Sequence, residues 1–427
     1  MQKIIPVFLF LLFSLLNPAA AQPQQDVYFK GAIKESKEIL QKNLLRNTIN
    51  KNLSLPLNEE TEENWMDAFW GMQLLHYSSP WADGRINLAI DSIGKRSIYF
   101  QRALLELAYT NYQDRYLKEI TSFMSITRDA KIFAMCAEYL ALNKITQLTV
   151  NKLKIKRPHL VKNDKDKAII NELLNRLTNI NKPVKCATVN VVTSQDFLKG
   201  IGILYSFQRK NRNYPGIAMV RDSTGRFIRD ETGNVFSVPQ LARSISNMPG
   251  YLTNGNTPQG IFRMYGFDTS KTTFIGPTTN IQLTMPFETS LQHFLNDSTI
   301  TDTAWSEQWY ASLLPEGLKN CQPLFESFYA GKAGRSEIIA HGTTVDPEYY
   351  KGKSYYPQTP TMGCLCTKEI WNDVDGKRME SDQQKLVAAL MKAGGANGYC
   401  VVIEIDDQQR AVTIQDLLSL INKQDLL

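Results

Sequence analysis

The strongest constraint on the fold is a change in hydrophobic periodicity near residue 180. Over residues 27–182, apolar side chains recur at the 3.6-residue spacing of helices that bury one face. Over residues 190–406, shorter apolar runs of strand type alternate with turns rich in Gly, Pro and Thr. The pattern predicts an α+β multidomain protein, in which an all-α domain of hairpin or solenoid-like form precedes a β-rich domain. Residues 407–427 are expected to form a helical tail.

These patterns also predict individual elements. Helices are expected at residues 62–76, 102–109, 129–142, 239–246, 290–295, 305–314, 322–329 and 383–392. Strands are expected at residues 189–192, 203–207, 217–221, 226–228, 260–264, 273–275, 281–285, 338–341 and 401–405. The side chains of Trp65, Phe69 and Trp70 could line a ligand groove, but packing in the helical core is the preferred interpretation.

The first 21 residues have the organisation of a secretory signal peptide. Lys3 supplies a positive charge, residues 4–16 are apolar, and Ala19-Ala20-Ala21 is a small-residue cleavage site. A membrane anchor would need about 20 apolar residues, and Asn17-Pro18 interrupts the run. The sequence therefore predicts export to the periplasm or cell envelope. No other segment is apolar and long enough to span a bilayer.

Charge and cysteine content limit the classes of partner. The formal net charge of +6 is mild, and no block of Lys and Arg indicates nucleic-acid binding. In an exported protein, paired disulfides are the default interpretation of six cysteines, for instance Cys366 with Cys321 or Cys400. No C-x-x-C pair is present, so neither a metal nor another cofactor is expected.

A histidine and a cysteine form the candidate catalytic pair. The apolar run Ile338–Ala340 ends in His341, and the turn Thr361-Met362-Gly363 precedes Cys364. An imidazole can remove the thiol proton, and the resulting thiolate can attack a carbonyl. Gly363 allows a tight turn whose amides could face the developing oxyanion. Another group should orient the imidazole, and the sequence does not identify it.

Three segments resemble the YkuD-type L,D-transpeptidases, which remodel peptidoglycan. Thr257–Phe262 is similar to the family's Thr-Pro-x-Gly-x-Phe strand, His341–Thr343 to its His-Gly-Thr strand end, and Thr361–Cys364 to its nucleophile turn. The resemblance covers about residues 195–406 and leaves the helical half outside it. It implies a β-rich sandwich with a catalytic cleft at one face.

The resemblance also implies a reaction and a set of site residues. Cys364 would be the nucleophile and His341 the general base and acid, while Gly363 would shape the oxyanion turn. The remaining positions implied for substrate binding are Gly342, Thr343, Thr361, Met362, Tyr355 and Tyr356. The expected substrates are peptidoglycan stem peptides: a tetrapeptide would acylate Cys364, release D-Ala and pass its acyl group to an amine. The helical half is a possible site for a protein partner.

Two departures from the family pattern leave alternatives open. Cys366 stands where the family commonly has Arg or Asn, and the Tyr-rich insert at residues 346–356 lengthens the interval between His341 and Cys364. The insert could be a lid over the cleft or a surface loop that packs on itself. Water as acceptor would make the protein a carboxypeptidase or hydrolase, and a degenerate site would leave a cell-wall-binding scaffold.

Overall fold

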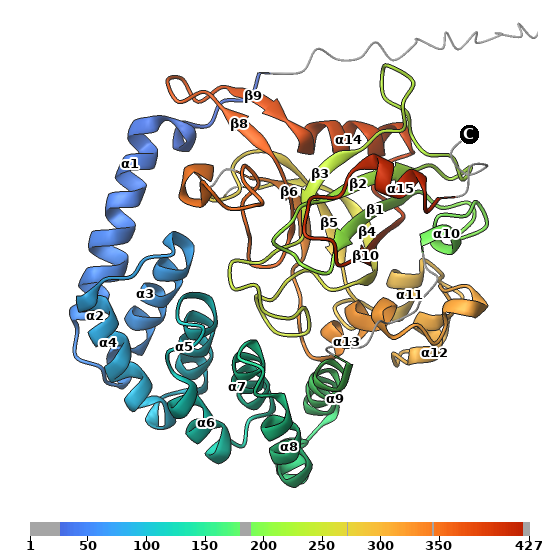
Figure 1. Ribbon diagram of the computed structural model, residues 1–427. Helices are drawn as coiled ribbons and strands as arrows, with labels where there is room; N and C mark the ends of the chain where they lie inside the picture. Colours follow the sequence, from blue (N-terminus) through green and yellow to red (C-terminus); the bar gives the residue numbers. More distant parts are fainter. Residues whose placement is uncertain (1–25, 180–188, 271, 344–345, 422–427) are drawn as a thin grey trace, which may run out of the picture.

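The structure is a computed structural model that describes residues 26–179, 189–270, 272–343 and 346–421. The expected signal peptide at residues 1–21 lies outside the described residues. A helical N-terminal region precedes a β-rich region built on a closed sheet (Figure 1), which confirms the predicted α+β class.

The N-terminal region is an arc of helices around one side of the barrel (Figure 1). Their bounds are α1 (Lys34–Asn43), α2 (Asn52–Ser54), α3 (Glu62–Leu75), α4 (Pro80–Asp91), α5 (Ile98–Asn111), α6 (Leu117–Ile126), α7 (Ala130–Leu142), α8 (Thr146–Leu160) and α9 (Asp164–Asn179). A π-helical stretch, Leu44–Lys51, joins α1 to α2. The side chains of Ser79, Ser97 and Asp129 accept backbone N–H bonds at the starts of α4, α5 and α7, as expected of N-caps.

Alternate helices of the arc pack side by side. α3 packs on α5, α5 on α7 and α7 on α9. The helices α6 and α8, which lie between these helices in sequence, also pack on α7. The side chains of Trp65 and Phe69 are fully buried in this layer, as the core interpretation predicted. Trp70 packs edge-on against Phe274 of the β-rich region, with ring centroids 5.3 Å apart. The helical layer is therefore joined to the barrel by side chains of both parts.

Eight of the described strands close into a barrel in the order β1-β10-β4-β5-β6-β7-β3-β2. Their bounds are β1 (Ile203–Arg209), β2 (Gly216–Arg221), β3 (Val238–Leu241), β4 (Gly260–Thr269), β5 (Thr279–Thr284), β6 (Ile339–Gly342), β7 (Leu365–Thr367) and β10 (Tyr399–Asp406). The pairs β1–β10 and β6–β7 are parallel, and the other neighbours are antiparallel. The parallel pair β6–β7 holds the two segments of the candidate site.

Apolar side chains cover both faces of the sheet. One face, which includes Ala340 and Leu365, packs on α14 (Asp382–Lys392). Parts of the other face pack on short helices of the β-rich region and of the C-terminal segment. These elements are α11 (Leu291–Leu295), α12 (Glu307–Ala311), α13 (Glu326–Lys332) and α15 (Ile414–Leu418). Because side chains alternate along a strand, His341 lies on the face opposite Ala340.

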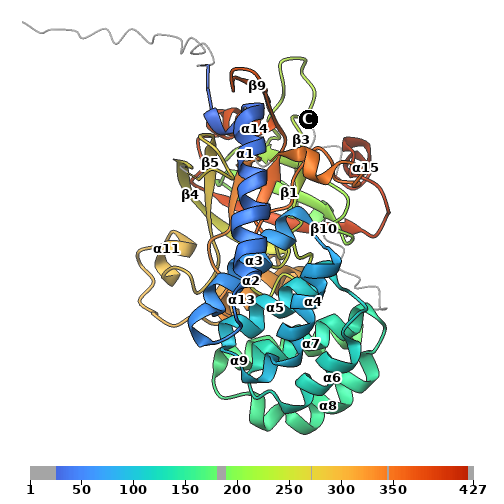
Figure 2. The same cartoon turned by 90° about the vertical axis from the view of Figure 1, so that its left-hand side faces the viewer.

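The N-terminal segment contacts a hairpin that comes late in the sequence. Figure 2 shows α1 running along the barrel, with its start near the β8 (Glu369–Trp371) and β9 (Arg378–Ser381) hairpin. The Phe29 amide donates to the Gly376 carbonyl oxygen at 2.9 Å, and Lys37 pairs with Asp373 at 2.7 Å. The helical region is thus attached to the β-rich region at both of its ends, since α9 also packs on α13.

Four of the expected elements are wrong. Residues 226–228, predicted as a strand, contain only an isolated bridge between Phe227 and Arg221. Residues 189–192, predicted as a strand, form the short helix α10 (Val189–Val192), and residues 239–246, predicted as a helix, contribute the strand β3. Residues 273–275 form a turn instead of a strand. Runs of three or four apolar residues do not distinguish helix from strand. In β3, pairing with β2 and β7 decides the outcome.

Candidate active site

The register of β6 and β7 brings the histidine and the cysteine onto neighbouring strands. His341 lies opposite Cys366 and Ala340 opposite Leu365, and Cys364 immediately precedes β7. Cys364 is therefore level with Ile339, two residues before His341 on the adjacent parallel strand. Adjacent strands lie about 4.8 Å apart and two residues span roughly 6.6 Å, so the Cα atoms of Cys364 and His341 are roughly 8 Å apart.

The imidazole of His341 is oriented by its own neighbour in the chain. Nδ1 lies 2.9 Å from the Gly342 carbonyl oxygen, which can only accept a hydrogen bond, so Nδ1 carries the proton and Nε2 has its lone pair free. Burial lowers the pKa of His341, partly offset by this hydrogen bond. A neutral imidazole with a free Nε2 is the form that a general base requires.

Cys364 is partly exposed as a residue, and its thiol lies beside the segment that leads into β6. Sγ lies 3.7 Å from the Glu337 carbonyl oxygen, to which it donates. Burial raises the pKa of Cys364, while a hydrogen bond from the Ile339 amide and the charge of Arg335 oppose that rise. Within the described part of the chain, no hydrogen bond joins Sγ to His341. The resting pair is therefore a thiol and a neutral imidazole.

The turn before Cys364 is held by its own threonine. Thr361 Oγ1 donates to the Cys364 carbonyl oxygen at 3.0 Å and accepts from the Gly363 amide at 3.0 Å. Gly363 has a φ of 113°, and a Cβ at this position would overlap the Arg335 guanidinium. The position thus requires glycine. Its amide, expected to serve the oxyanion, is already engaged with Thr361 in this conformation.

The segment that contains Thr257, which leads into β4, contacts the same turn. Thr257 Oγ1 donates to the Gly363 carbonyl oxygen at 2.9 Å, and both residues are buried. Three residues further on, Gly260 has a φ of 120° and lies against Ser327, Leu324 and Tyr310, where a Cβ would not fit. The segments that contain Thr257, His341 and Cys364 are far apart in the sequence, and they meet at one place in the fold.

The residues expected to bind substrate fall into two groups. Met362 is 43% exposed and Tyr356 38%, and Thr361 is also partly exposed. Gly342, Thr343 and Tyr355 are buried. A Cβ on Gly342 would overlap the Glu369 carboxyl group, Thr343 Oγ1 is hydrogen-bonded to Thr359 Oγ1, and the Tyr355 ring lies under the Arg243 guanidinium. The buried group supports the site from within.

Cys366 is a free thiol. It is fully buried, and burial raises its pKa to about 12. Cys136, Cys364 and Cys400 are also free, whereas Cys321 is disulfide-bonded. The suggested pairing of Cys366 with Cys321 or Cys400 is therefore wrong. A buried, protonated thiol cannot supply the substrate contact that Arg or Asn would make at this position.

Arg335 was not anticipated from the sequence. Its guanidinium is buried and donates to the carbonyl oxygens of Gly250, Gly255 and Asn256, the last two at 2.6 Å. Nη2 also reaches the Gly363 carbonyl oxygen at 3.5 Å. Arg335 thus connects the loop at residues 249–257 to the turn of Cys364. No local motif marks such a residue, because all of its partners are distant in sequence or lie on backbone atoms.

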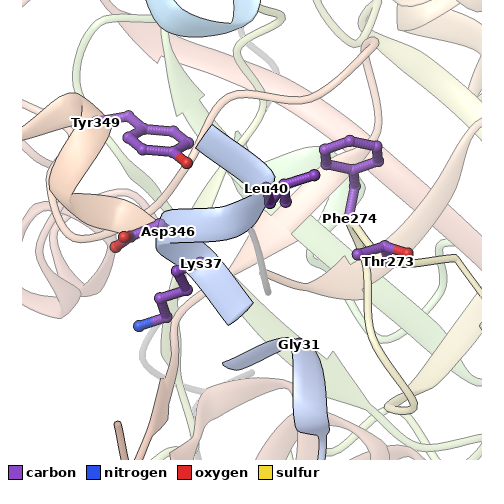
Figure 3. A pocket seen from close by; sticks show the side chains of 7 residues that line it. All are labelled: Gly31, Lys37, Leu40, Thr273, Phe274, Asp346 and Tyr349. Atoms are coloured by element: carbon purple, nitrogen blue, oxygen red, sulfur yellow. The ribbon is translucent and has the colours of Figure 1, made fainter. Parts of the chain in front are cut away.

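A small pocket lies away from the candidate site. It is lined by Lys37 and Leu40 of α1, by Thr273 and Phe274, and by Asp346 and Tyr349 of the insert, with Gly31 at its edge (Figure 3). Neither His341 nor Cys364 lines it. In the described ranges, no group of three or more His, Cys, Asp or Glu side chains is arranged to bind a metal ion.

Comparisons with family models, curated proteins and solved structures find no match to this chain. Among the described helices, none combines the length and apolar character needed to cross a membrane. What can be concluded about function therefore rests on the residues of the site and on their arrangement.

Proposed function

We propose that this protein is an exported cysteine L,D-transpeptidase that acts on peptidoglycan stem peptides. The observation that carries the proposal is the meeting of Thr257, His341 and Cys364 at the parallel pair β6–β7. The tautomer set by the Gly342 carbonyl oxygen supports it, since it leaves Nε2 available as a base. The partial exposure of Cys364 and Met362 supports it further, because a peptide must reach the thiol.

The reaction would begin with proton transfer. The thiol turns from the Glu337 carbonyl oxygen toward His341, and Nε2 takes its proton. The thiolate attacks the carbonyl carbon of the third, L-configured residue of a stem tetrapeptide and forms a tetrahedral intermediate. The imidazolium returns the proton to the nitrogen of the departing D-Ala, and a thioester to Cys364 remains.

The second half uses the same groups in reverse. An amine of another stem peptide attacks the thioester carbonyl and loses a proton to Nε2, and the thiolate leaves and is reprotonated. The product is a 3→3 cross-link. Water as the acceptor would give hydrolysis by the same steps. The proposal also includes a catalytic cleft in a sandwich-like β domain, as in the L,D-transpeptidase family.

Mass spectrometry of products tests the proposal. The chain lacking residues 1–21 is incubated with disaccharide-tetrapeptides, and we expect loss of D-Ala together with covalent dimers of the substrate. Cys364→Ala should abolish both products and the acyl adduct on the intact protein, whereas Cys366→Ala, which changes a buried thiol, should retain them. Loss of D-Ala without dimers would indicate a hydrolase. No product and no adduct from the wild-type protein would overturn the proposal in favour of a non-catalytic scaffold.

A further inference from the structure

The guanidinium of Arg335 lies in an unusual environment for a buried cation. Its residue is 5% exposed, and in the described part of the chain no carboxylate forms an ion pair with it. Its hydrogen bonds go to backbone carbonyl oxygens of the 249–257 loop and of Gly363. A buried charge is costly unless an opposite charge compensates it. Carbonyl dipoles compensate it only in part.

Among the described residues, the thiol of the candidate nucleophile is the ionisable group that favours the charged form of this guanidinium. Arg335 and Cys364 interact electrostatically, and the interaction stabilises the charged form of each. Burial lowers the pKa of Arg335 to about 10, so the guanidinium stays charged at neutral pH. The other ionisable groups that act on the thiol are Glu337, whose carboxylate disfavours a thiolate, and Cys366, which is protonated. Among the described residues, Arg335 is thus the cation whose charge favours the thiolate, and its Nη2 lies beside Gly363, the residue before Cys364.

We propose that Arg335 is a positioning residue that holds the Cys364 turn against the 249–257 loop and supplies the positive charge that stabilises the Cys364 thiolate. Two separate features carry this role. The hydrogen bonds to Gly255 and Gly363 fix the turn, and the charge acts on the sulfur. The close approach of the guanidinium also explains why residue 363 is a glycine, since any Cβ there would overlap Nη2.

Arg221 provides a matched control. Its guanidinium is also buried, at 1% exposure, and it donates to the carbonyl oxygens of Ser194 and Phe197 without an ion pair to any described carboxylate. It lies on β2 and stacks over Tyr205, on strands that do not flank Cys364. Removing either arginine deletes a buried cation bonded to carbonyls, but only Arg335 acts on the thiol.

The test measures ionisation of the thiol without substrate. Cys364 is alkylated with iodoacetamide across a pH series, and labelling is assigned by peptide mass spectrometry; the other free thiols described are buried. An opposite charge nearby favours a charged form by about one pKa unit or more. We therefore expect Arg335→Met to shift the alkylation profile upward by about one pH unit and to slow labelling at pH 7 roughly tenfold. Arg335→Lys, which keeps the charge, should lie closer to wild type, and Arg221→Met should leave the profile unchanged.

Folding of each variant is checked by thermal unfolding before labelling. An unshifted profile in folded Arg335→Met would overturn the proposed charge effect, as would an equal shift in Arg221→Met. If Arg335→Met does not fold, Arg335→Lys and Arg335→Gln replace it: an equal profile for these two variants would contradict a role for the charge. The inference rests on the proposed function, since it concerns the thiol of the proposed transpeptidase. The alkylation test itself does not depend on that activity. A shifted alkylation profile in Arg335→Met, together with no cross-linked product from the wild-type protein, would count against the proposed enzyme function and not against the role of Arg335.

Discussion

The helical region meets the barrel through two segments near Cys364, and the contacts of the two segments differ in kind. The 249–257 loop enters the helical core, where Tyr251 and Leu252 are buried among helix side chains. The insert at residues 346–356 packs on Leu241 and contacts the helical region through Tyr350. One segment is part of the helical core, whereas the other rests on its edge.

The loop is also bonded to buried ionisable side chains. Tyr251 donates to Glu138 at 2.8 Å, Asn254 donates to Glu106 at 3.1 Å, and Lys131 donates to Thr253 at 2.7 Å. Glu106, Lys131 and Glu138 are buried on α5 and α7. Because Arg335 joins the same loop to Gly363, the helices are linked to the Cys364 turn through polar contacts. The helical region is thus a structural support of the candidate site.

Among the described residues, the insert makes one buried hydrogen bond to the helical region. Tyr350 donates to the Leu74 carbonyl oxygen at 3.1 Å, and its ring contacts His76 and Tyr355. The insert therefore packs on the helical region, which neither the lid nor the self-packing interpretation described. The comparison implies that changes in the loop should reach Cys364, whereas changes in the insert should affect Cys366, whose strand partner Leu241 packs against Tyr350.

The largest expected effect is that of Tyr350→Ala. Removing a buried aromatic ring leaves a cavity, and the free energy of unfolding should fall by about 3–5 kcal/mol, measured by urea denaturation. Cys366 should become more open to alkylation, since Tyr350 packs on Leu241, the residue paired with Cys366 between β3 and β7. The rate for Cys364 should stay within about twofold of wild type. Slowing of Cys364 comparable to that in Arg335→Met would remove the distinction between the two segments.

Glu138→Ala should have the next largest effect. Its carboxylate accepts from Tyr251 and from Arg176 Nε at 3.0 Å, and its removal leaves a buried hydroxyl without this acceptor. Since the Arg176 side chain is 46% exposed, we expect a loss of about 2–3 kcal/mol in the free energy of unfolding, below that of a fully buried pair. Tyr251→Phe, which removes only the hydroxyl, should cost about 1 kcal/mol. Cys364 alkylation should change in Glu138→Ala, and an unaltered rate would show that the loop does not transmit the loss.

A third prediction concerns pH. Burial raises the pKa of Glu106 to about 7, against a hydrogen bond from Asn254 that opposes the rise. Between about pH 4.5 and 7 the folded state therefore holds a proton that the unfolded state has released, so this group makes stability fall as pH rises. Glu106→Gln keeps an acceptor for Asn254 but does not titrate. Its free energy of unfolding relative to wild type should rise by about 2 kcal/mol between pH 5 and pH 8; a difference constant with pH would contradict the shift.

The features predicted from the sequence are those that local patterns determine. The helices around Trp65 and Phe69 follow from periodicity, and the strand ending at His341 from its apolar run. The sequence also indicated Thr257 and Cys364 as site residues, and the fold brings Thr257 into contact with the turn that precedes Cys364. The strand β3 could not be predicted, because its partners β2 and β7 decide its conformation.

The rest of the site depends on contacts between distant segments. The Gly342 carbonyl oxygen that orients His341 belongs to the backbone, and every residue type offers such an oxygen. Arg335 acquires its role only when the 249–257 loop folds over it. Tyr355 was expected at the substrate, but it lies buried under Arg243, whose position depends on Asn213 and Ser244. Residue type alone cannot show which tyrosine of the insert faces solvent.

The smallest expected effect comes from the exposed side of the insert. Tyr356 is 38% exposed and donates to Glu348 Oε1 at 2.7 Å, a contact near the surface that also includes Lys351. Tyr356→Phe should change the free energy of unfolding by less than about 0.5 kcal/mol, because exposed polar contacts exchange readily with water. Its effect on turnover is the informative quantity. If Tyr356 contacts the stem peptide, KM for the tetrapeptide should rise while the Cys364 alkylation profile stays fixed. An unchanged KM would place the tyrosine outside the substrate path.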